Sequence, residues 1–202
     1  MENLTERGSP MDKREEYLTT TPWEQFKKRI PWLLLLMVST TFTGMIITAF
    51  QDALAARVAL TAFIPMLMGT GGNSGSQTSA TVIRGLSLGE VTVCHLSRVL
   101  WQELRTAILC GGVLSVACFL KIWLVDGLLL GNDQITPGIN GVVCLALFVT
   151  VVAAKLIGAI LPVMAKRLRM DPAVMASPLI TTLVDTLSLL VYFLLARFFL
   201  KI

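Results

Sequence analysis

The stretch PWLLLLMVSTTFTGMIITAF, residues 31–50, decides the fold class of this chain. It carries no charged residue, and a helix of about 20 apolar residues rises about 30 Å, the thickness of the hydrocarbon core of a bilayer. Backbone polar groups in lipid must be satisfied within the segment, so a helix rather than a strand is expected. Residues 31–50 are therefore predicted to form a transmembrane helix.

Four further apolar runs of similar length follow, at residues 60–83, 106–125, 138–165 and 172–199. Of the 202 residues, 54% are hydrophobic and only 15% are charged, a composition typical of a bilayer protein rather than a soluble domain. The predicted fold class is therefore all-α integral membrane, with five transmembrane helices in one domain at residues 31–202.

Two shorter segments precede the first span. Residues 1–21 are polar and charged without helical periodicity, and we predict a disordered cytoplasmic tail. Thr21, Pro22 and Glu24 then form the signature of a helix N-terminus. Residues 22–30 are predicted to be a juxtamembrane helix whose aromatic and basic residues suit an anionic membrane surface, and an ordinary charged flank is the alternative.

The basic residues indicate an orientation. They gather at residues 27–29, 84–105 and 166–169, whereas the loop at 126–140 carries two aspartates and no Lys or Arg. Because basic flanks stay on the cytoplasmic side, the N-terminus is expected to be cytoplasmic and the C-terminus external. The predicted location is the cell membrane (plasma or inner membrane), as a multi-pass protein.

Several function classes are disfavoured. The net charge of +4 arises from span ends and not from one basic stripe, which argues against nucleic-acid binding. The chain shows no nucleophile-and-base constellation, no paired carboxylates and no HExxH motif, so an enzyme is not expected. Four cysteines lack the CxxC spacing of a zinc site or a disulfide framework. They are Cys94, Cys110, Cys118 and Cys144.

The strongest functional signal is Asp185, in the middle of the last predicted span. A carboxylate at mid-bilayer costs about 3 kcal/mol even on the gentler insertion scale, so it indicates function by default. At about 100° per residue, one stripe of this span is polar and the other faces are apolar, which suggests a pore lining for a divalent cation. The stripe comprises Ser177, Pro178, Thr181, Asp185, Ser188 and Tyr192.

A structural role for Asp185 is the alternative. Lys155 is the candidate counter-ion near the middle of another span, and a Lys155–Asp185 ion pair would be its concrete form. Glu103 lies between Arg98 and Arg105 near the start of the third span, and we predict that it belongs to a solvated ion-pair cluster. Ion access or gating is the other interpretation of Glu103.

A second polar signal is the run GTGGNSGSQTSAT at residues 69–81 of the second span. Its glycines permit close helix contact or a local break in the helix, and such backbone is tolerated at membrane depth only against protein or a water-filled cavity. Gly72 belongs to this run, and Asn73 and Gln77 share one helical face, which favours a polar pore lining. Helix packing alone is the alternative.

Several motifs are distinctive when they occur together. They are Pro65, GGNSGSQ at 71–77, Arg84-Gly85, Arg98-Val99 with Glu103-Leu104, and Asp171-Pro172-Ala173 leading to Pro178-Leu179 and Asp185. In this order they resemble the transmembrane domain of the MgtE magnesium channel family, from residue 31 to the C-terminus. The resemblance implies five helices, a homodimer and an ion path at the dimer axis between the second and fifth helices.

The resemblance also implies residue roles. The family's central metal-binding aspartate falls on Asp185, with support from the backbone oxygen of Thr181 and from the polar residue before the proline, here Ser177. Mg²⁺ keeps several waters and needs one or two carboxylates, which two copies of Asp185 would supply. Mn²⁺ and Co²⁺ are further candidates. Family members commonly carry regulatory CBS domains upstream, and regulation by them is expected to be absent here.

The predicted function is therefore passage of Mg²⁺ toward the cytoplasm through a homodimeric channel in the lipid bilayer. Proton- or sodium-coupled export of divalent cations is an alternative from the exchanger class, in which Asp185 would alternate between protonated and metal-bound forms. A third hypothesis is a membrane scaffold that transports nothing and packs through its glycine-rich second span.

Overall fold

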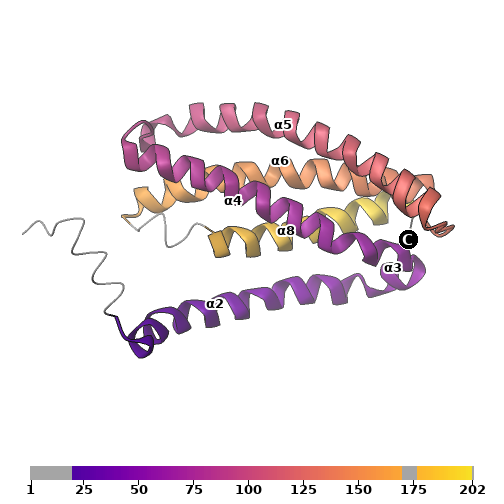
Figure 1. Cartoon of the computed structure of the whole chain (residues 1–202), viewed down its shortest axis with the longest axis horizontal. Coiled ribbons are helices and arrows are strands. Elements are labelled where there is room, and N and C mark those ends of the chain that lie inside the picture. The colour runs from indigo at the N-terminus through magenta and orange to yellow at the C-terminus, as the bar shows by residue number, and fades with distance from the viewer. Residues whose placement is uncertain (1–19, 170–176, 202) are drawn as a thin grey trace, which may run out of the picture. The chain divides into compact units, whose positions relative to one another are not determined.

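The structure is a computed structural model and describes residues 20–169 and 177–201. Its residues fall into two compact units, one ending at Val38 and one beginning at Ser39. No strand occurs within these described ranges, and the all-α prediction is confirmed there. The elements in Figure 1 are α2 (Pro22–Ala49), α3 (Gln51–Ala56), the 3₁₀ helix η1 (Val58–Phe63), α4 (Ile64–Leu88), the 3₁₀ helix η2 (Val93–His95), α5 (Leu96–Lys121), the π-helix η3 (Ile122–Leu129), α6 (Pro137–Arg167) and α8 (Ser177–Leu200).

Helix α2 begins where the sequence predicts. The backbone N–H of Thr21 donates to Oε2 of Glu24 at 3.2 Å, and the backbone N–H of Glu24 donates to Oγ1 of Thr21 at 3.4 Å, which is a reciprocal capping box. The helix continues through Pro31 as one element, so no helix boundary separates residues 22–30 from the first span. Their placement on a membrane surface stays a prediction, and most of the expected tail lies outside the described residues.

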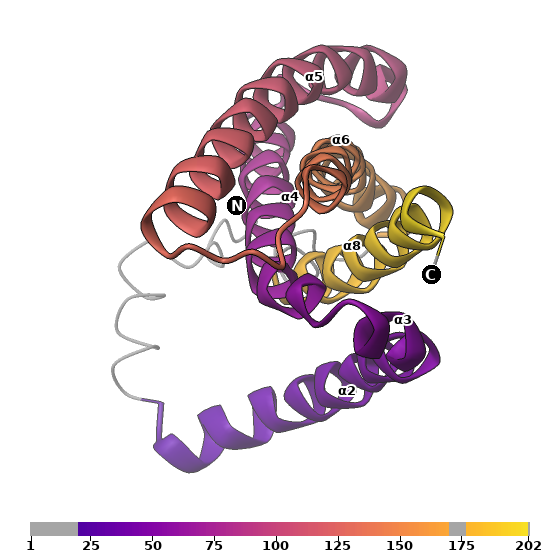
Figure 2. The same ribbon diagram turned by 90° about the vertical axis from the view of Figure 1, so that its right-hand side faces the viewer.

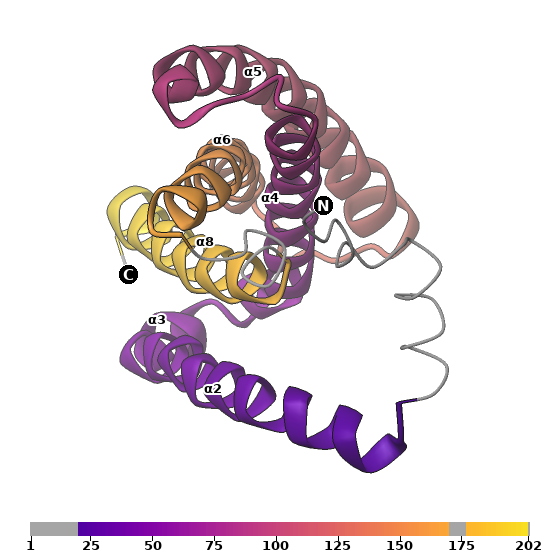
Figure 3. The same ribbon diagram turned by 90° about the vertical axis from the view of Figure 1, so that its left-hand side faces the viewer.

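The second unit is organised around α6. This helix packs against α4, α5 and α8, and α4 also packs on α8 (Figures 2 and 3). Because α6 has neighbours on three sides, small residues such as Ala146, Ala154 and Ala159 are fully buried along it. Residues of α4 therefore meet α6 on one side and α8 on another, which becomes important at the functional site.

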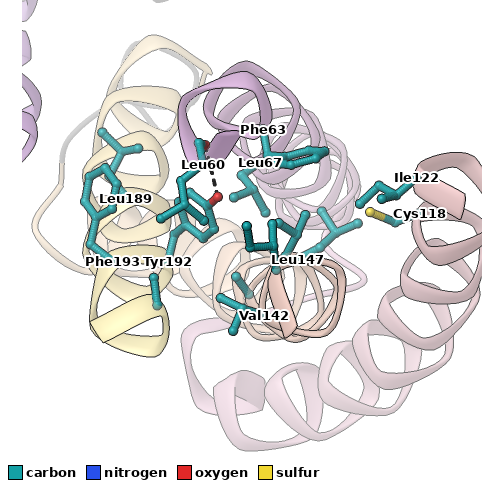
Figure 4. Packing of buried hydrophobic residues seen from close by; sticks show 14 of the residues in the cluster. Leu60, Phe63, Leu67, Cys118, Ile122, Val142, Leu147, Leu189, Tyr192 and Phe193 are labelled. Carbon is teal, nitrogen blue, oxygen red and sulfur yellow. Dashed lines mark hydrogen bonds between the residues drawn. The ribbon is translucent and has the colours of Figure 1, made fainter. Parts of the chain in front are cut away.

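A hydrophobic core forms where η1, the end of α5, the start of α6 and the end of α8 meet (Figure 4). Leu60 and Phe63 enter it from η1, and Tyr192 and Phe193 from α8. The hydroxyl of Tyr192 donates to the backbone carbonyl of Leu60 at 3.0 Å and so satisfies a polar group that burial would otherwise leave unpaired. Tyr192 was placed on the polar stripe by helical periodicity, but the structure assigns it to this core.

Four described helical segments are long and apolar enough to cross a membrane: Pro22–Ala49, Val93–Leu129, Pro137–Arg167 and Pro178–Leu200. Helix α4, with 25 residues, has the necessary length but carries the glycine-rich polar run that lowers its hydropathy. The chain is thus a multi-pass α-helical membrane protein, and the membrane crossing of α4 stays a prediction. The motif residues Asp171-Pro172-Ala173 lie outside the described residues.

The outer face of α5 and η3 also fits a bilayer. Trp101 and Trp123 are 60% and 58% exposed, and the residues between them rise about 33 Å along the helix. Tryptophan is enriched at the two membrane–water interfaces, which are separated by about this distance. The exposed side chains between them include Ile108, Leu109, Val113, Val116 and Phe119. The composition of this face thus suits contact with lipid.

Candidate functional site

Asp185 lies on the side of α8 that faces α4. A Cβ atom built on Gly72 of α4 would lie 3.7 Å from Oδ1 of Asp185 and 3.1 Å from Cγ2 of Thr181. The absence of a side chain at Gly72 therefore lets the α4 backbone approach Thr181 and Asp185 closely. The Asp185 carboxylate is half-buried, and no hydrogen bond or ion pair joins it to another described residue.

The polar stripe of α8 divides into two parts. Ser188 is fully buried, and its hydroxyl donates to the carbonyl of Val184 at 2.6 Å. Its Oγ would lie 3.0 Å from a Cβ on Gly71, so it is enclosed by the α4–α8 contact. Ser188 thus lies inside the α4–α8 contact, and a pore-lining role for it stays a prediction. Pro178 is exposed at the start of the helix, and the side chain of Ser177 lies outside the described part of the chain.

The run at residues 69–81 forms an unbroken part of α4 with two different faces. One face is buried and rich in small residues. The other is exposed and carries Asn73 and Gln77, whose side-chain amides make no hydrogen bond with another described residue. A close helix contact and a polar surface therefore coexist in this run, and the local break that the glycines also permitted does not occur. The exposed face comprises Gly69, Asn73, Gln77, Ala80, Thr81 and Arg84.

The buried face of α4 touches α6 backbone to backbone. A Cβ on Gly158 of α6 would overlap the carbonyl group of Gly75, and a Cβ on Gly75 would lie 3.1 Å from the carbonyl oxygen of Ala154. Small residues permit such close approach between membrane helices. The packing interpretation is therefore correct for this face. Gly158 was not predicted, because an isolated glycine in an apolar run has no distinctive spacing.

Two charged residues meet at Thr78 of α4. Lys155 of α6 is only 8% exposed, and its Nζ donates to Oγ1 of Thr78 at 3.2 Å. The Thr78 hydroxyl in turn donates to Oε2 of Glu103 on α5 at 3.1 Å. The structure thereby joins α4, α5 and α6 through a polar network that the sequence does not reveal.

The contacts of Lys155 exclude the ion pair that was the structural alternative for Asp185, and the prediction of an ion-pair cluster around Glu103 is wrong. Lys155 does not pair with Asp185, because Thr78 and Gly72 are six residues apart and point in directions about 120° apart around α4. Glu103 makes no ion pair with a neighbouring arginine. Within residues 20–169 and 177–201, the one ion pair within 4.0 Å joins Lys121 and Asp126, at 2.7 Å.

The polar side chains near the α4–α8 contact offer oxygen atoms. Asp185 supplies a carboxylate at the contact, and Asn73, next to Gly72 along α4, carries an amide oxygen on the exposed face of that helix. Oxygen ligands of this kind suit Mg²⁺, which keeps several of its waters and takes one or two carboxylates. No group of three or more His, Cys, Asp or Glu side chains gathers as a metal site in the described ranges.

Comparison with known proteins identifies the family. The sequence model of the MgtE family, described as a divalent cation transporter, matches residues 64–195. Proteins named magnesium transporter MgtE are similar to the chain: 42% identical over 168 residues in Bacillus subtilis, covering 82% of this chain and 35% of that protein, and 34% identical over 185 residues in Thermus thermophilus, covering 92% and 39%. The chain thus spans between a third and two fifths of the length of these relatives. Because the family model matches well over half of its length, the chain belongs to the MgtE family.

Proposed function

We propose that this chain conducts Mg²⁺ across the cell membrane toward the cytoplasm, with Asp185 as the group that binds the ion. The two relatives are named magnesium transporters and the family is described as a divalent cation transporter, which supports the class of cargo. Mn²⁺ and Co²⁺ share the oxygen ligands and are expected to compete.

One observation carries the proposal. The Asp185 carboxylate is half-buried against Gly72, in a helix apolar enough to cross a membrane, and none of the described residues neutralises it. A carboxylate in such a position is costly unless a cation or water reaches it. A hydrated Mg²⁺ ion would supply the missing charge.

The exposed face of α4 supports a homodimer. Asn73 and Gln77 belong to a helix of membrane-spanning length, and amides facing hydrocarbon would be costly. Two copies of the chain that bring these faces together around a twofold axis would enclose a polar path, with Gly72 beside it. They would also bring two Asp185 carboxylates to the ion. Thr181 and Ser177 are proposed to assist, through oxygen atoms on the same helix.

The direction follows from the membrane potential. Moving one elementary positive charge through 100 mV toward the negative side releases about 2.3 kcal/mol of free energy. A divalent ion that enters a compartment held about 100 mV negative inside therefore releases about twice that amount. We place the N-terminus in the cytoplasm, from the distribution of basic flanks. No coupling ion is needed for inward flux under these conditions.

The test is uptake of Mg²⁺ into liposomes that contain a fluorescent Mg²⁺ indicator and hold a negative internal potential. The purified chain is compared with Asp185→Ala at equal incorporation. Asp133→Asn is the matched control, because Asp133 is an exposed carboxylate in the loop before α6. We expect uptake by the wild type and by Asp133→Asn and its loss in Asp185→Ala. Equal uptake in all three would remove Asp185 from the ion path.

The same liposomes separate the alternatives. A flux that requires an imposed proton or sodium gradient would indicate a coupled exporter. Absence of flux in a correctly folded wild-type dimer would favour the scaffold.

The dimer axis is tested by cross-linking in a background without the native cysteines. Gln77→Cys lies on the exposed polar face of α4, and Leu109→Cys is its control on the apolar face of α5, where Leu109 is 72% exposed. We expect an oxidised dimer from Gln77→Cys alone. Cross-linking of Leu109→Cys with none from Gln77→Cys would place the interface elsewhere.

A further inference from the structure

The bridge between Lys155 and Glu103 has a defined direction. An ammonium group can only donate hydrogen bonds and a carboxylate can only accept them, so the Thr78 hydroxyl must accept from Lys155 and donate to Glu103. The two charges are consequently held no more than about 6 Å apart, within the range of strong Coulomb attraction in a protein interior. Thr78 is 2% exposed, so water does not readily replace it.

Such a pair is not the simplest way to pack three helices. Lys155 is buried and Glu103 is partly buried, so the pair carries a desolvation cost that the mutual attraction offsets only in part, and apolar side chains of similar volume are often equally stable or more so. The surrounding contacts on this face of α4 are made by small residues such as Gly75 and Ala154. A role beyond packing is therefore worth seeking for Lys155 and Glu103.

Their position relative to Asp185 suggests that role. Thr78 contacts Lys155, and Gly72, six residues earlier on the same helix, contacts Asp185. Six residues correspond to about 9 Å of helix rise. At this range a unit charge in the bundle still changes the potential felt by a divalent ion, because intervening protein screens poorly.

We propose that Lys155 and Glu103 form a charge pair, bridged by Thr78, that sets the affinity of the neighbouring Asp185 site for a divalent cation. This inference rests on the proposed function of Asp185. Lys155 weakens binding of the ion and Glu103 limits that weakening. Conduction requires a site that attracts the ion yet lets it leave, and a compensated positive charge nearby provides such a balance.

The proposal predicts opposite effects for the two charges. Lys155→Met keeps an unbranched side chain of similar length and leaves Glu103 uncompensated, so the KM for Mg²⁺ falls. Glu103→Gln keeps the shape and an acceptor oxygen for Thr78 but leaves Lys155 uncompensated, so the KM rises. Each shift is expected to be about three- to tenfold, for a divalent ion and an effective dielectric constant between those of a protein surface and water.

Two further variants distinguish this electrostatic role from a structural one. The double variant Lys155→Met/Glu103→Gln is expected to give a KM between those of the two single variants, because its two charge changes oppose each other. Thr78→Val removes the bridge but leaves both charges, so it is expected to lower the melting temperature with little change in KM.

Two measurements are made on the full chain: KM from Mg²⁺ uptake into liposomes, and apparent Mg²⁺ affinity from the dependence of melting temperature on MgCl₂ concentration in detergent. Opposite shifts in the two single variants, with an intermediate value in the double variant, support the proposal. Shifts of the same sign in both single variants, or no shift in either measurement, overturn it. If the wild type binds Mg²⁺ without transporting it, the proposed function fails while the affinity shifts still decide the inference.

Discussion

The contacts of α4 with α8 and with α5 and α6 differ in whether the charged group there has a partner. Toward α8, Gly72 packs against Asp185, whose carboxylate has no partner among the described residues. Toward α5 and α6, Thr78 joins Lys155 and Glu103, so each charged group there has a hydrogen-bonding partner. The Asp185 carboxylate, which has no partner, and the hydrogen-bonded groups of Lys155 and Glu103 thus contact different sides of the same helix.

The difference indicates where a cargo ion belongs. A buried charge with a protein partner is already compensated, and adding a cation there would disturb it. A half-buried carboxylate without a partner is compensated only when a cation or water reaches it. A charged group in a hydrophobic helix therefore indicates an ion site only when it has no hydrogen-bond or ion-pair partner in the protein.

The largest expected effect tests the close contact between α4 and α6 at Gly75 and Gly158. Gly158→Ala places a methyl group on the Gly75 carbonyl, so α4 and α6 must separate, and we expect a loss of about 1–3 kcal/mol of stability. Gly112→Ala is the control, since a Cβ there meets nothing within 4 Å. In a helix this control should be neutral or stabilising by up to about 1 kcal/mol. Melting in detergent compares them, and equal melting temperatures would contradict the α4–α6 contact.

The second prediction compares the stability lost when the partnered charge of Lys155 is removed with the effect of removing the unpartnered charge of Asp185. Lys155→Met leaves the Glu103 carboxylate and the Thr78 hydroxyl without their cationic partner, and we expect a loss of about 1–3 kcal/mol. Asp185→Asn removes a charge that has no partner and that is costly without a cation, so its stability should stay unchanged or rise. Chemical or thermal unfolding in the absence of Mg²⁺ measures both. A loss in Asp185→Asn as large as in Lys155→Met would show that Asp185 is a structural residue.

The third prediction concerns two residues of the same α8 stripe. Tyr192→Phe leaves the buried carbonyl of Leu60 without its donor and is expected to cost about 1 kcal/mol of stability while Mg²⁺ uptake keeps its KM. Asp185→Asn, in contrast, is expected to change the KM for Mg²⁺ uptake without lowering stability. If Tyr192→Phe changed the KM at unchanged stability, Tyr192 would belong to the ion path and not to the core.

The smallest expected effect lies at the ion site itself. Gly72→Ala brings a methyl group to 3.1 Å from Cγ2 of Thr181, so the neighbouring helix must yield by a few tenths of an ångström, and we expect a loss below about 1 kcal/mol. The added group also faces Asp185 and should slow Mg²⁺ uptake. Gly112→Ala, on α5 with nothing within 4 Å of its Cβ, is the control. Equal uptake in both variants would separate Gly72 from the ion path.

Features that depend on neighbours in sequence were predictable. The capping box at Thr21 and Glu24 was found because its two hydrogen bonds join residues three apart. The polar face with Asn73 and Gln77 followed from helical periodicity in the same way. Periodicity could not show that Ser188 and Tyr192 are buried, because it defines a stripe without saying which neighbour covers each part of it.

The class of the protein follows from the sequence alone, because apolar runs of bilayer length require helices. The sequence also identifies Asp185 as a costly carboxylate within one of these runs, which indicates a functional role. Which charged group lacks a partner, in contrast, depends on the tertiary structure. Thr78 and Glu103 are 25 residues apart in the chain, and Thr78 and Lys155 are 77 apart. Their contact depends on how α4, α5 and α6 cross, and those crossings depend on glycine contacts such as Gly75 with Gly158 that have no periodic signature.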